Sequence, residues 1–262
     1  MSRVLLQEMT WPEVQKKIDS NILEVLLPIG STEQHGPHMP LGVDTYIPMW
    51  AAEQVAHQTG TPVAPPLWYA PCEHHMGFPG TISLRSSTMM NILFDMCSSL
   101  RRHGFREFII LNGHTSGANP VLLTAIDEIQ RELKDVRVWI VDVVLMARDA
   151  VFGAAETDIL YHADEVEAAQ MLVARPDLVW LDKAEKIEPV PQSPFMPLGY
   201  RGERDQILWR HTPEEWKTLT HLGNIGDPTA ATVEKGQKMM NGLVENVVSF
   251  VKERRAFIQS GN

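Results

Sequence analysis

Continuous runs of apolar residues recur along the chain with the length expected of buried strands. The clearest runs are residues 22–29, 62–67, 108–111 and 136–145. Runs of this kind are typical of parallel strands, because helices cover both faces of a parallel sheet and exclude water from both. We therefore predict a strand in each of these four segments.

Between these runs, apolar residues return every three or four positions, which is the spacing of an amphipathic helix. Strand and helix thus alternate at intervals of roughly thirty to forty residues, a pattern that predicts βαβ units. The expected fold class is α/β, with a mostly parallel sheet between two layers of helices. The helical positions after the first three runs are Ile47, Trp50, Ala51 and Val55, then Met89, Ile92, Leu93, Met96 and Leu100, then Leu122, Ile126, Ile129 and Leu133.

Capping residues indicate where the helices begin and end. Thr10 and Glu13 have the spacing of a capping box, while Gly60 and Gly104 are stop signals for two later helices. The last helix should run to about Arg254. Further helix starts are expected at Asp44, at Asn119-Pro120 and at Asp227-Pro228.

The regular pattern lapses between residues 188 and 224, where prolines, Trp209, Trp216 and mixed charges replace any period. Long segments without regular structure inside a domain are often functional. We interpret this segment as an irregular excursion of the same domain, serving as a lid or as an oligomer contact. Residues 1–262 are then expected to form one domain.

Composition narrows the range of partners. The 262 residues are 44% hydrophobic and 21% charged, as in an ordinary globular protein. A net charge of −10 argues against nucleic acid and anionic membranes, because both require clustered Lys and Arg. The chain shows neither a signal-peptide pattern nor the run of ~20 apolar residues that a membrane span needs. The expected location is therefore the cytoplasm.

Potential metal ligands follow the first and the third predicted strands, and another follows the loop after the fourth. Glu33, His35 and Asp44 come after the first strand, His114 after the third, and Glu167 beyond the fourth. The carboxyl ends of parallel strands meet at one edge of the sheet, where α/β proteins bind their ligands. Mixed histidine and carboxylate ligands suit zinc, manganese or iron better than calcium. Because candidate ligands from separate segments meet at the same edge of the sheet, we predict a metal site there.

Each of these residues also has a purely structural interpretation. Asp44 could be only a helix cap, His114 only a turn residue, and Glu167 only the capping-box partner of Asp164. No nucleophile motif competes with the metal site, although Cys72 remains a candidate thiol nucleophile. Three other loop histidines at the same edge could be ligands, substrate contacts or neither: His38, His74 and His75.

Several segments together resemble the signatures of the creatininase (creatinine amidohydrolase) family. The matches extend from about residue 24 to residue 245, which is nearly the whole chain. The matching segments are LPIGSTEQHG at 27–36 with Asp44, FPGTIS at 78–83, NGH at 112–114, His162 with Glu167, and GDP at 226–228 with EKG at 234–236.

The resemblance implies a layered α/β/α domain, usually assembled as a hexamer, with two divalent metal ions per subunit. By position, Glu33 and His114 would belong to one ion and His35 and Glu167 to the other, with Asp44 bridging them. Zinc is the first expectation for the metal, and manganese and iron are the alternatives.

His162 takes the position of the family's catalytic histidine. Water held between two divalent ions loses a proton near neutral pH, whereas bulk water has a pKa of ~15.7. The hydroxide then attacks a substrate carbonyl, and a histidine with an unperturbed pKa of ~6.5 can protonate the leaving group. Substrate contacts are expected from His75, Thr115, Ser116 and Asp158.

Two positions depart from creatininases proper. Ser116 stands where they carry a glutamate, and residues 158–161 (DILY) lack the tryptophan that precedes the catalytic histidine. We therefore predict a dinuclear metal-dependent hydrolase acting on a small polar cyclic amide or a related carbonyl compound other than creatinine. The alternatives are a carbon–carbon hydrolase that opens the ring of an oxidised inositol, and a non-enzymatic metal-binding scaffold. Polar residues suited to such a substrate are Asp158, Tyr200, Arg201, Glu203 and Arg204.

Overall fold

A parallel sheet of three strands lies at the centre of the computed structural model, which describes residues 3–189, 193, 195–196, 199 and 210–259. Leu26 in the first strand pairs with Ile109 in the second, which pairs with Trp139 in the third. The strands, in their order across the sheet, are β1 (Glu24–Ile29), β2 (Glu107–Asn112) and β3 (Arg137–Asp142).

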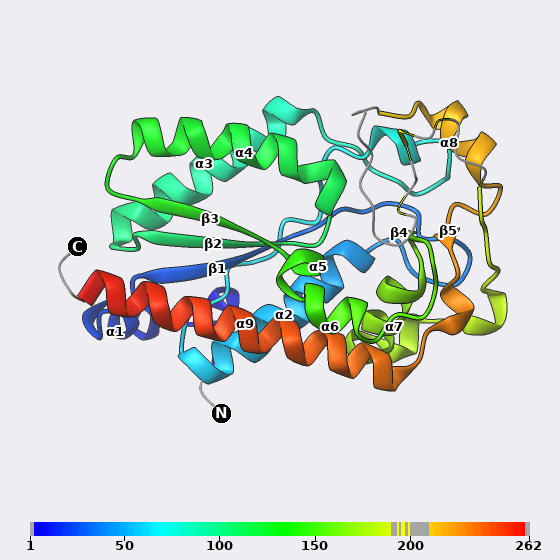
Figure 1. Cartoon of the computed structure of the whole chain (residues 1–262). Helices are drawn as coiled ribbons and strands as arrows, with labels where there is room; N and C mark the ends of the chain where they lie inside the picture. The colour runs from blue at the N-terminus through cyan, green and yellow to red at the C-terminus, as the bar shows by residue number, and fades with distance from the viewer. Residues whose placement is uncertain (1–2, 190–192, 194, 197–198, 200–209, 260–262) are drawn as a thin grey trace.

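Helices cover both faces of this sheet (Figure 1). Val25 and Leu27 of β1 pack into the core on one face, while Leu26 between them packs into the core on the other. Successive strand residues point to opposite faces, so an entirely apolar strand supplies both cores. The predicted three-layer α/β/α architecture is therefore confirmed. The covering helices are α3 (Ser86–His103) and α4 (Thr115–Glu132) on one face, and α2 (Val43–Thr59) and α9 (Val233–Gln259) on the other.

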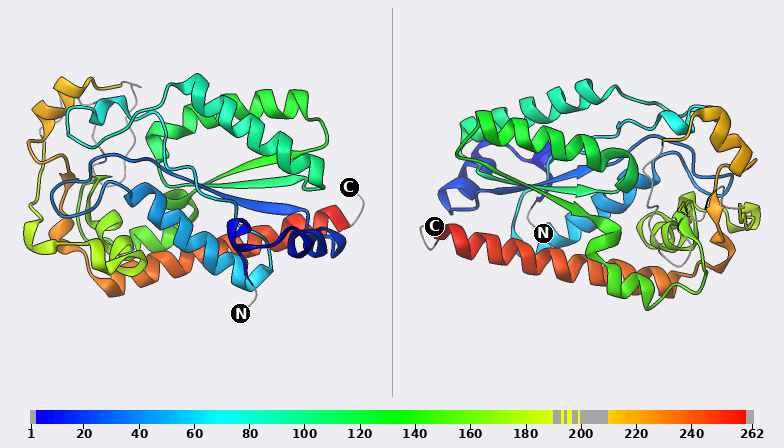
Figure 2. Two further views of the ribbon diagram at one scale, coloured as in Figure 1. Left: turned by 180° about the vertical axis from the view of Figure 1, so that it is seen from behind. Right: turned by 45° about the horizontal axis from the view of Figure 1, so that its top comes forward.

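The smaller elements gather mostly at one end of the molecule, beyond the carboxyl ends of the strands (Figure 2). There β4 and β5 form an antiparallel pair beside α7 and α8. α1 (Trp11–Asp19) lies at the opposite end. The elements at the strand ends are α5 (Val143–Met146), α6 (Arg148–Phe152), β4 (Leu160–His162), α7 (Glu165–Ala174), α8 (Pro213–Leu219) and β5 (Ile225–Gly226).

Two strand predictions were wrong in extent. The segment 62–67 makes only isolated parallel bridges to β1, through Val63 and Leu67. The segment 136–145 leaves the sheet at Asp142, because this carboxylate accepts backbone N–H groups of the next turn and starts α5. In the first case the ladder is interrupted by residues that have no N–H to donate, namely Pro62, Pro65 and Pro66.

Three helix starts also differ from the prediction. Gly42 precedes α2, so Asp44 lies inside its first turn and keeps its carboxylate for the site described below. The Asn119-Pro120 pair lies within α4, which begins directly after the turn that ends β2. Asp227 caps only a short 3₁₀ turn, and the Thr232 hydroxyl accepts from the first turn of α9.

The predicted capping box and the two glycine stops are confirmed, whereas the last helix continues past Arg254 to Gln259. The Glu13 carboxylate accepts the N–H of Thr10, and Gly60 and Gly104 end α2 and α3 in the left-handed conformation that favours glycine. The excursion at 188–224 is described only in part, and that part contains α8. Among the helices of the described ranges, none is both long and apolar enough to cross a membrane.

Candidate metal centre

Five histidine and carboxylate side chains converge where β1 and β2 end. Four of them are buried and Glu167 is half-buried, so the structure brings together every metal ligand expected from the sequence. They are supplied by the loop after β1 (Glu33 and His35), the first turn of α2 (Asp44), the turn after β2 (His114) and the first turn of α7 (Glu167).

His35 and His114 each face a different oxygen of the Asp44 carboxylate. His35 Nε2 lies 3.1 Å from Asp44 Oδ1, and His114 Nδ1 lies 2.9 Å from Asp44 Oδ2. Glu167 Oε2 is 3.7 Å from His35 Nε2, and Glu33 Oε2 is 3.4 Å from His114 Nδ1. The described residues form three groups of potential ligand atoms, each within 4.8 Å, and two of these groups share Asp44. The third group joins Glu33, His35 and His162.

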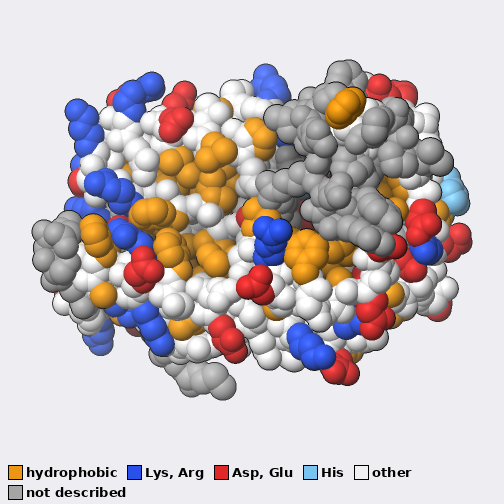
Figure 3. Space-filling model, in the orientation of Figure 1, with side chains coloured by type: hydrophobic (Ala, Val, Ile, Leu, Met, Phe, Trp, Pro, Cys, Tyr) orange, Lys and Arg blue, Asp and Glu red, His pale blue; other side chains and the backbone are white. Residues whose placement is uncertain are grey.

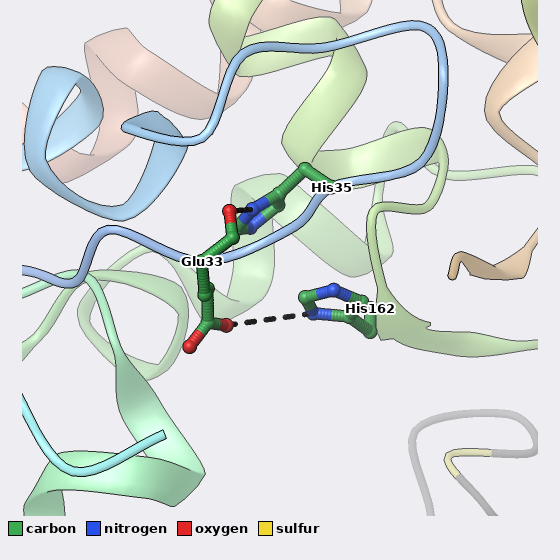
Figure 4. A group of neighbouring side chains, drawn as sticks. All are labelled: Glu33, His35 and His162. Atoms are coloured by element: carbon green, nitrogen blue, oxygen red, sulfur yellow. Dashed lines mark hydrogen bonds and ion pairs between the residues drawn. The ribbon is translucent and has the colours of Figure 1, made fainter. Parts of the chain in front are cut away.

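Backbone carbonyls orient both imidazoles. His114 Nε2 lies 3.1 Å from the Pro71 carbonyl oxygen, and His35 Nδ1 lies 3.1 Å from the Glu33 carbonyl oxygen (Figure 4). A metal-binding histidine usually donates its second ring N–H in this way, which fixes the tautomer and leaves the other nitrogen for the ion. The nitrogens that remain are those facing Asp44.

The donor atoms fit a divalent ion. Glu33 Oε2 is buried and has no hydrogen-bond partner within the described ranges. A buried carboxylate oxygen without a partner costs several kcal/mol, a cost that a bound cation removes. Imidazole nitrogen together with carboxylate oxygen is the donor set of zinc, and also suits manganese and iron.

The pKa shifts of the protein groups also indicate a site for a cation. Burial opposes protonation, but Asp44 and its neighbours raise the pKa of His35 to about 10, and Glu33 and Asp44 raise the pKa of His114 well above its ordinary value. Burial raises the pKa of Glu167 to about 8. Protons are thus held where cations can replace them, so metal binding should release protons.

His162 reaches the same centre from β4. Its Nδ1 lies 3.9 Å from Glu33 Oε1 (Figure 4), and its Nε2 lies 2.9 Å from the Gln34 carbonyl oxygen. Burial and the charge of His35 lower the pKa of His162 well below its ordinary value. The ring is therefore a neutral imidazole at the edge of the ligand group.

The residues expected to contact substrate are not all at the centre. His75 is buried, with Nε2 3.4 Å from Glu33 Oε1. Thr115 directly follows His114, and its buried hydroxyl has no hydrogen-bond partner in the described part of the chain. Asp158 is exposed and lies outside the buried group. Outside the described residues are the Ser116 side chain and Tyr200, Arg201, Glu203 and Arg204.

Glu167 faces the centre, but it does not complete the capping box that was considered for it. Asp164 caps α7 by accepting the N–H groups of Val166 and Glu167. The Glu167 carboxylate reaches back one residue further, to the N–H of Ala163 at 2.5 Å, and also faces His35. The helix cap therefore positions a carboxylate at the centre.

Cys72 has the environment of a buried structural thiol. Burial and the neighbouring carboxylates of Glu33 and Asp44 raise the pKa of this thiol, and its Sγ lies 3.4 Å from the Ile82 carbonyl oxygen. Because the thiolate is the reactive form, this setting argues against a nucleophilic role.

Sequence reasoning missed three residues that support the histidines. Trp216 of α8 lies with its ring centroid 4.4 Å from that of His75 and 5.5 Å from that of His162. Its Nε1–H donates to the Gly223 carbonyl at 3.1 Å, and the Gln34 side chain lies between the two histidines. Of these three residues, only Gln34 could have been found from the sequence, because it stands between the expected ligands Glu33 and His35.

Comparison with known sequences gives matches along almost the whole chain. Residues 7–251 match the model of the creatininase (creatinine amidohydrolase) family. A 3-dehydro-scyllo-inosose hydrolase of Thermotoga maritima is 29% identical, over 95% of this chain and 83% of its own length. A mycofactocin precursor peptide peptidase of Mycolicibacterium smegmatis is 30% identical, over 93% of this chain and 92% of its own length.

Solved structures agree with these matches. A creatinine amidohydrolase (creatininase) superposes with a TM-score of 0.84 at 25% identity, covering 97% of this chain and 98% of its own. Two further creatininase structures, described as Zn-Zn type and as Mn, give TM-scores of 0.83 and 0.84 at 25% identity and cover 97% of this chain and 99% of theirs.

Proposed function

Since this chain belongs to the creatininase family and is a metal-dependent hydrolase, we propose that it works with two divalent ions per subunit. The observation that carries the proposal is the pair of ligand groups sharing one carboxylate. Zinc is the first choice of metal, because creatininase structures include a Zn-Zn type, and manganese or iron are alternatives.

We assign the ligands from the two groups of atoms. Glu33 and His114 would hold one ion, His35 and Glu167 the other, and Asp44 would contribute one carboxylate oxygen to each. This division agrees with the family resemblance, and it uses the ring nitrogens that the backbone carbonyls leave available.

Hydrolysis requires an activated water and a proton carrier. When bound, two divalent ions lower the pKa of a water between them and polarise a substrate carbonyl. His162 supplies the proton transfer, because its ring is neutral and its Nδ1 faces the ligand group at Glu33. It takes a proton at Nδ1 and returns it to the leaving group.

For the substrate we propose a small polar cyclic amide or a related carbonyl compound other than creatinine. The specific observation for a second candidate is the similarity to a 3-dehydro-scyllo-inosose hydrolase over 95% of the chain, which favours carbon–carbon cleavage in an oxidised cyclic polyol. Both reactions need the same electrophilic carbonyl and the same activated water. The ligand geometry therefore supports them equally.

The proposal is tested by assaying a panel of substrates with the metal removed and with the metal restored. The purified protein, stripped with chelator and reloaded with zinc or manganese, is assayed on creatinine, other lactams, formamides and 3-dehydro-scyllo-inosose. We expect turnover of one compound other than creatinine, lost on stripping and regained on reloading. Release of an amine or ammonia from that compound would exclude carbon–carbon cleavage. Absence of turnover with full metal loading would favour the scaffold alternative.

The variant His162→Ala tests the proton carrier. We expect turnover to fall about 10²- to 10⁴-fold, the usual contribution of general acid–base catalysis, while metal content and Tm stay nearly unchanged. Retained activity would overturn the catalytic assignment. Loss of metal would place His162 among the ligands, since a ring nitrogen of His162 lies within 4.8 Å of potential ligand atoms of Glu33 and His35.

We further propose a cytoplasmic homo-oligomer, a hexamer by family resemblance, with residues 1–262 as one domain. The net charge of −10 supports a protein without nucleic-acid or membrane partners. Figure 3 supports an oligomer, because hydrophobic side chains gather around β3 between α4 and α9. Apolar patches of this kind commonly mark protein contacts.

A further inference from the structure

The side chain of Gln34 lies between two histidines of the centre. Its Nε2 is 2.9 Å from His75 Nδ1, 2.9 Å from His162 Nε2 and 3.1 Å from the Gly223 carbonyl oxygen. Gln34 is buried, as are both histidines. The amide nitrogen thus has three neighbours but only two hydrogens to donate.

The orientation of this amide is set by its surroundings. The N–H of Gly36 donates to Gln34 Oε1 at 3.0 Å, so the oxygen is on that side and the nitrogen faces the histidines. Gly223 has a φ of +103°, and a Cβ there would lie 1.8 Å from Gln34 Oε1. Only glycine leaves room for the amide at this point.

One arrangement of hydrogens satisfies every group. The Gly223 oxygen can only accept, and here it takes one amide hydrogen beside the hydrogen from Trp216 Nε1. His162 Nε2 lies 2.9 Å from the Gln34 carbonyl oxygen, which also can only accept, and in this arrangement Nε2 carries a hydrogen and donates it to that oxygen. The second amide hydrogen then goes to His75 Nδ1, which must be bare.

We propose that Gln34 is a positioning residue that fixes both histidines in the Nε2–H tautomer. In this state His162 presents a bare Nδ1 toward Glu33 Oε1 at 3.9 Å, ready to accept a proton. His75 presents its Nε2–H to the same oxygen at 3.4 Å, which leaves Glu33 Oε2 for the ion. The effect on turnover rests on the proposed function, whereas the tautomer assignment does not.

The test compares Gln34→Met, which removes the amide, with Gln34→Glu, which replaces a donor by an acceptor. Zinc-loaded protein carrying ¹⁵N-labelled histidine is studied by solid-state NMR, which distinguishes protonated from bare ring nitrogens. Signals of the two rings are identified by their loss in His75→Phe and His162→Ala. In the unaltered protein we expect Nε2–H on both rings, and in Gln34→Glu we expect His75 to carry its hydrogen on Nδ1.

Zinc content and kinetics provide the second readout. With the compound of the panel that is hydrolysed fastest, both Gln34 variants should lose about ten- to a hundredfold in kcat, with KM changed less than about twofold and zinc content unchanged. The matched control is Gln130→Met, which removes a half-buried amide that bonds the Val138 backbone far from the centre.

Two results would overturn the inference. One is a His162 ring protonated at Nδ1, or a His75 tautomer that does not respond to Gln34→Glu. The other is loss of zinc together with kcat, which would make Gln34 a support for the metal ligands only. If no compound of the panel is hydrolysed, the proposed function fails, and the NMR result still decides the tautomers.

Discussion

Among the described residues, the carboxylate of Asp44 belongs to both of the ligand groups proposed for the two ions. One of its oxygens faces His35 and the other faces His114, and the Ser31 hydroxyl donates to Oδ2 at 2.8 Å. The two histidines lower the pKa of Asp44 well below its ordinary value although burial raises it. The two histidines thus favour the ionised form of Asp44, and in the proposed assignment both ions depend on it.

Metal stoichiometry should follow this sharing. We expect Asp44→Asn to lose both ions, whereas Glu167→Gln should lose about one of the two, because it contributes to one group only. Metal per chain is measured by atomic emission after gel filtration. The control is Asp158→Asn, whose exposed side chain lies outside the centre and should leave the content unchanged. Equal losses in the Asp44 and Glu167 variants would contradict the assignment.

At the scale of elements, a buried ion pair joins α7, which carries Glu167, to α9. Lys235 Nζ lies 2.6 Å from Glu165 Oε1, and the side chains are 12% and 0% exposed. The Glu165 carboxylate also accepts the N–H groups of Glu156 and Thr157. The start of α7 is thereby held at a fixed place against the long helix.

Removing one charge of this pair should be costly. We expect Glu165→Gln to lower the free energy of unfolding by about 1–3 kcal/mol at pH 7, because Lys235 then loses its buried carboxylate and keeps only the exposed Glu156 carboxylate and the Ala230 carbonyl oxygen. Urea unfolding measures the change. Glu234→Gln is the control, since its ion pair with Lys238 is exposed and should contribute less than about 1 kcal/mol.

The same pair gives a pH dependence with a defined sign. Burial raises the pKa of Glu165, but hydrogen bonds from Lys235 and Thr157 bring it below the ordinary value of 4.5. Its stabilising contribution is therefore complete above about pH 4.5 and is lost as the pH falls through the lower folded value. The difference between the unaltered protein and Glu165→Gln should shrink from pH 7 to pH 3, and a constant difference would contradict this account.

Most elements could be predicted because their signals are local. The apolar run of β1 and the glycines that end α2 and α3 depend only on neighbouring residues. The errors arose where long-range contacts determine the local structure. Asp44, for example, does not cap α2, because its carboxylate contacts His35. The meeting of the five candidate ligands was predictable from the strand ends. The roles of Trp216 and Gly223 were not, because their contacts to residues near 34, 75 and 162 leave no periodic pattern.

At the scale of the whole molecule, the described surface offers apolar side chains for assembly. Leu123 on α4 is 61% exposed and Phe257 on α9 is 45% exposed. We expect light scattering to give a mass near six times the 29.5 kDa of one chain. Leu123→Lys should reduce that mass if the face around β3 is a contact between copies. A monomer in the unaltered protein would contradict the hexamer.

The candidate ligands lie far apart in the chain, from Glu33 to Glu167, and the Gln34 contact extends to Gly223. Such a site cannot exist before the sheet has paired and α7 has docked, because long-range contacts form late in folding. Metal should therefore bind a chain that is already folded, slowing unfolding while hardly changing the refolding rate. Stopped-flow measurements with and without zinc test this, and faster refolding with zinc would contradict it. A newly made chain would then reach its fold before it meets its metal, and the supply of ions would control activity without controlling folding.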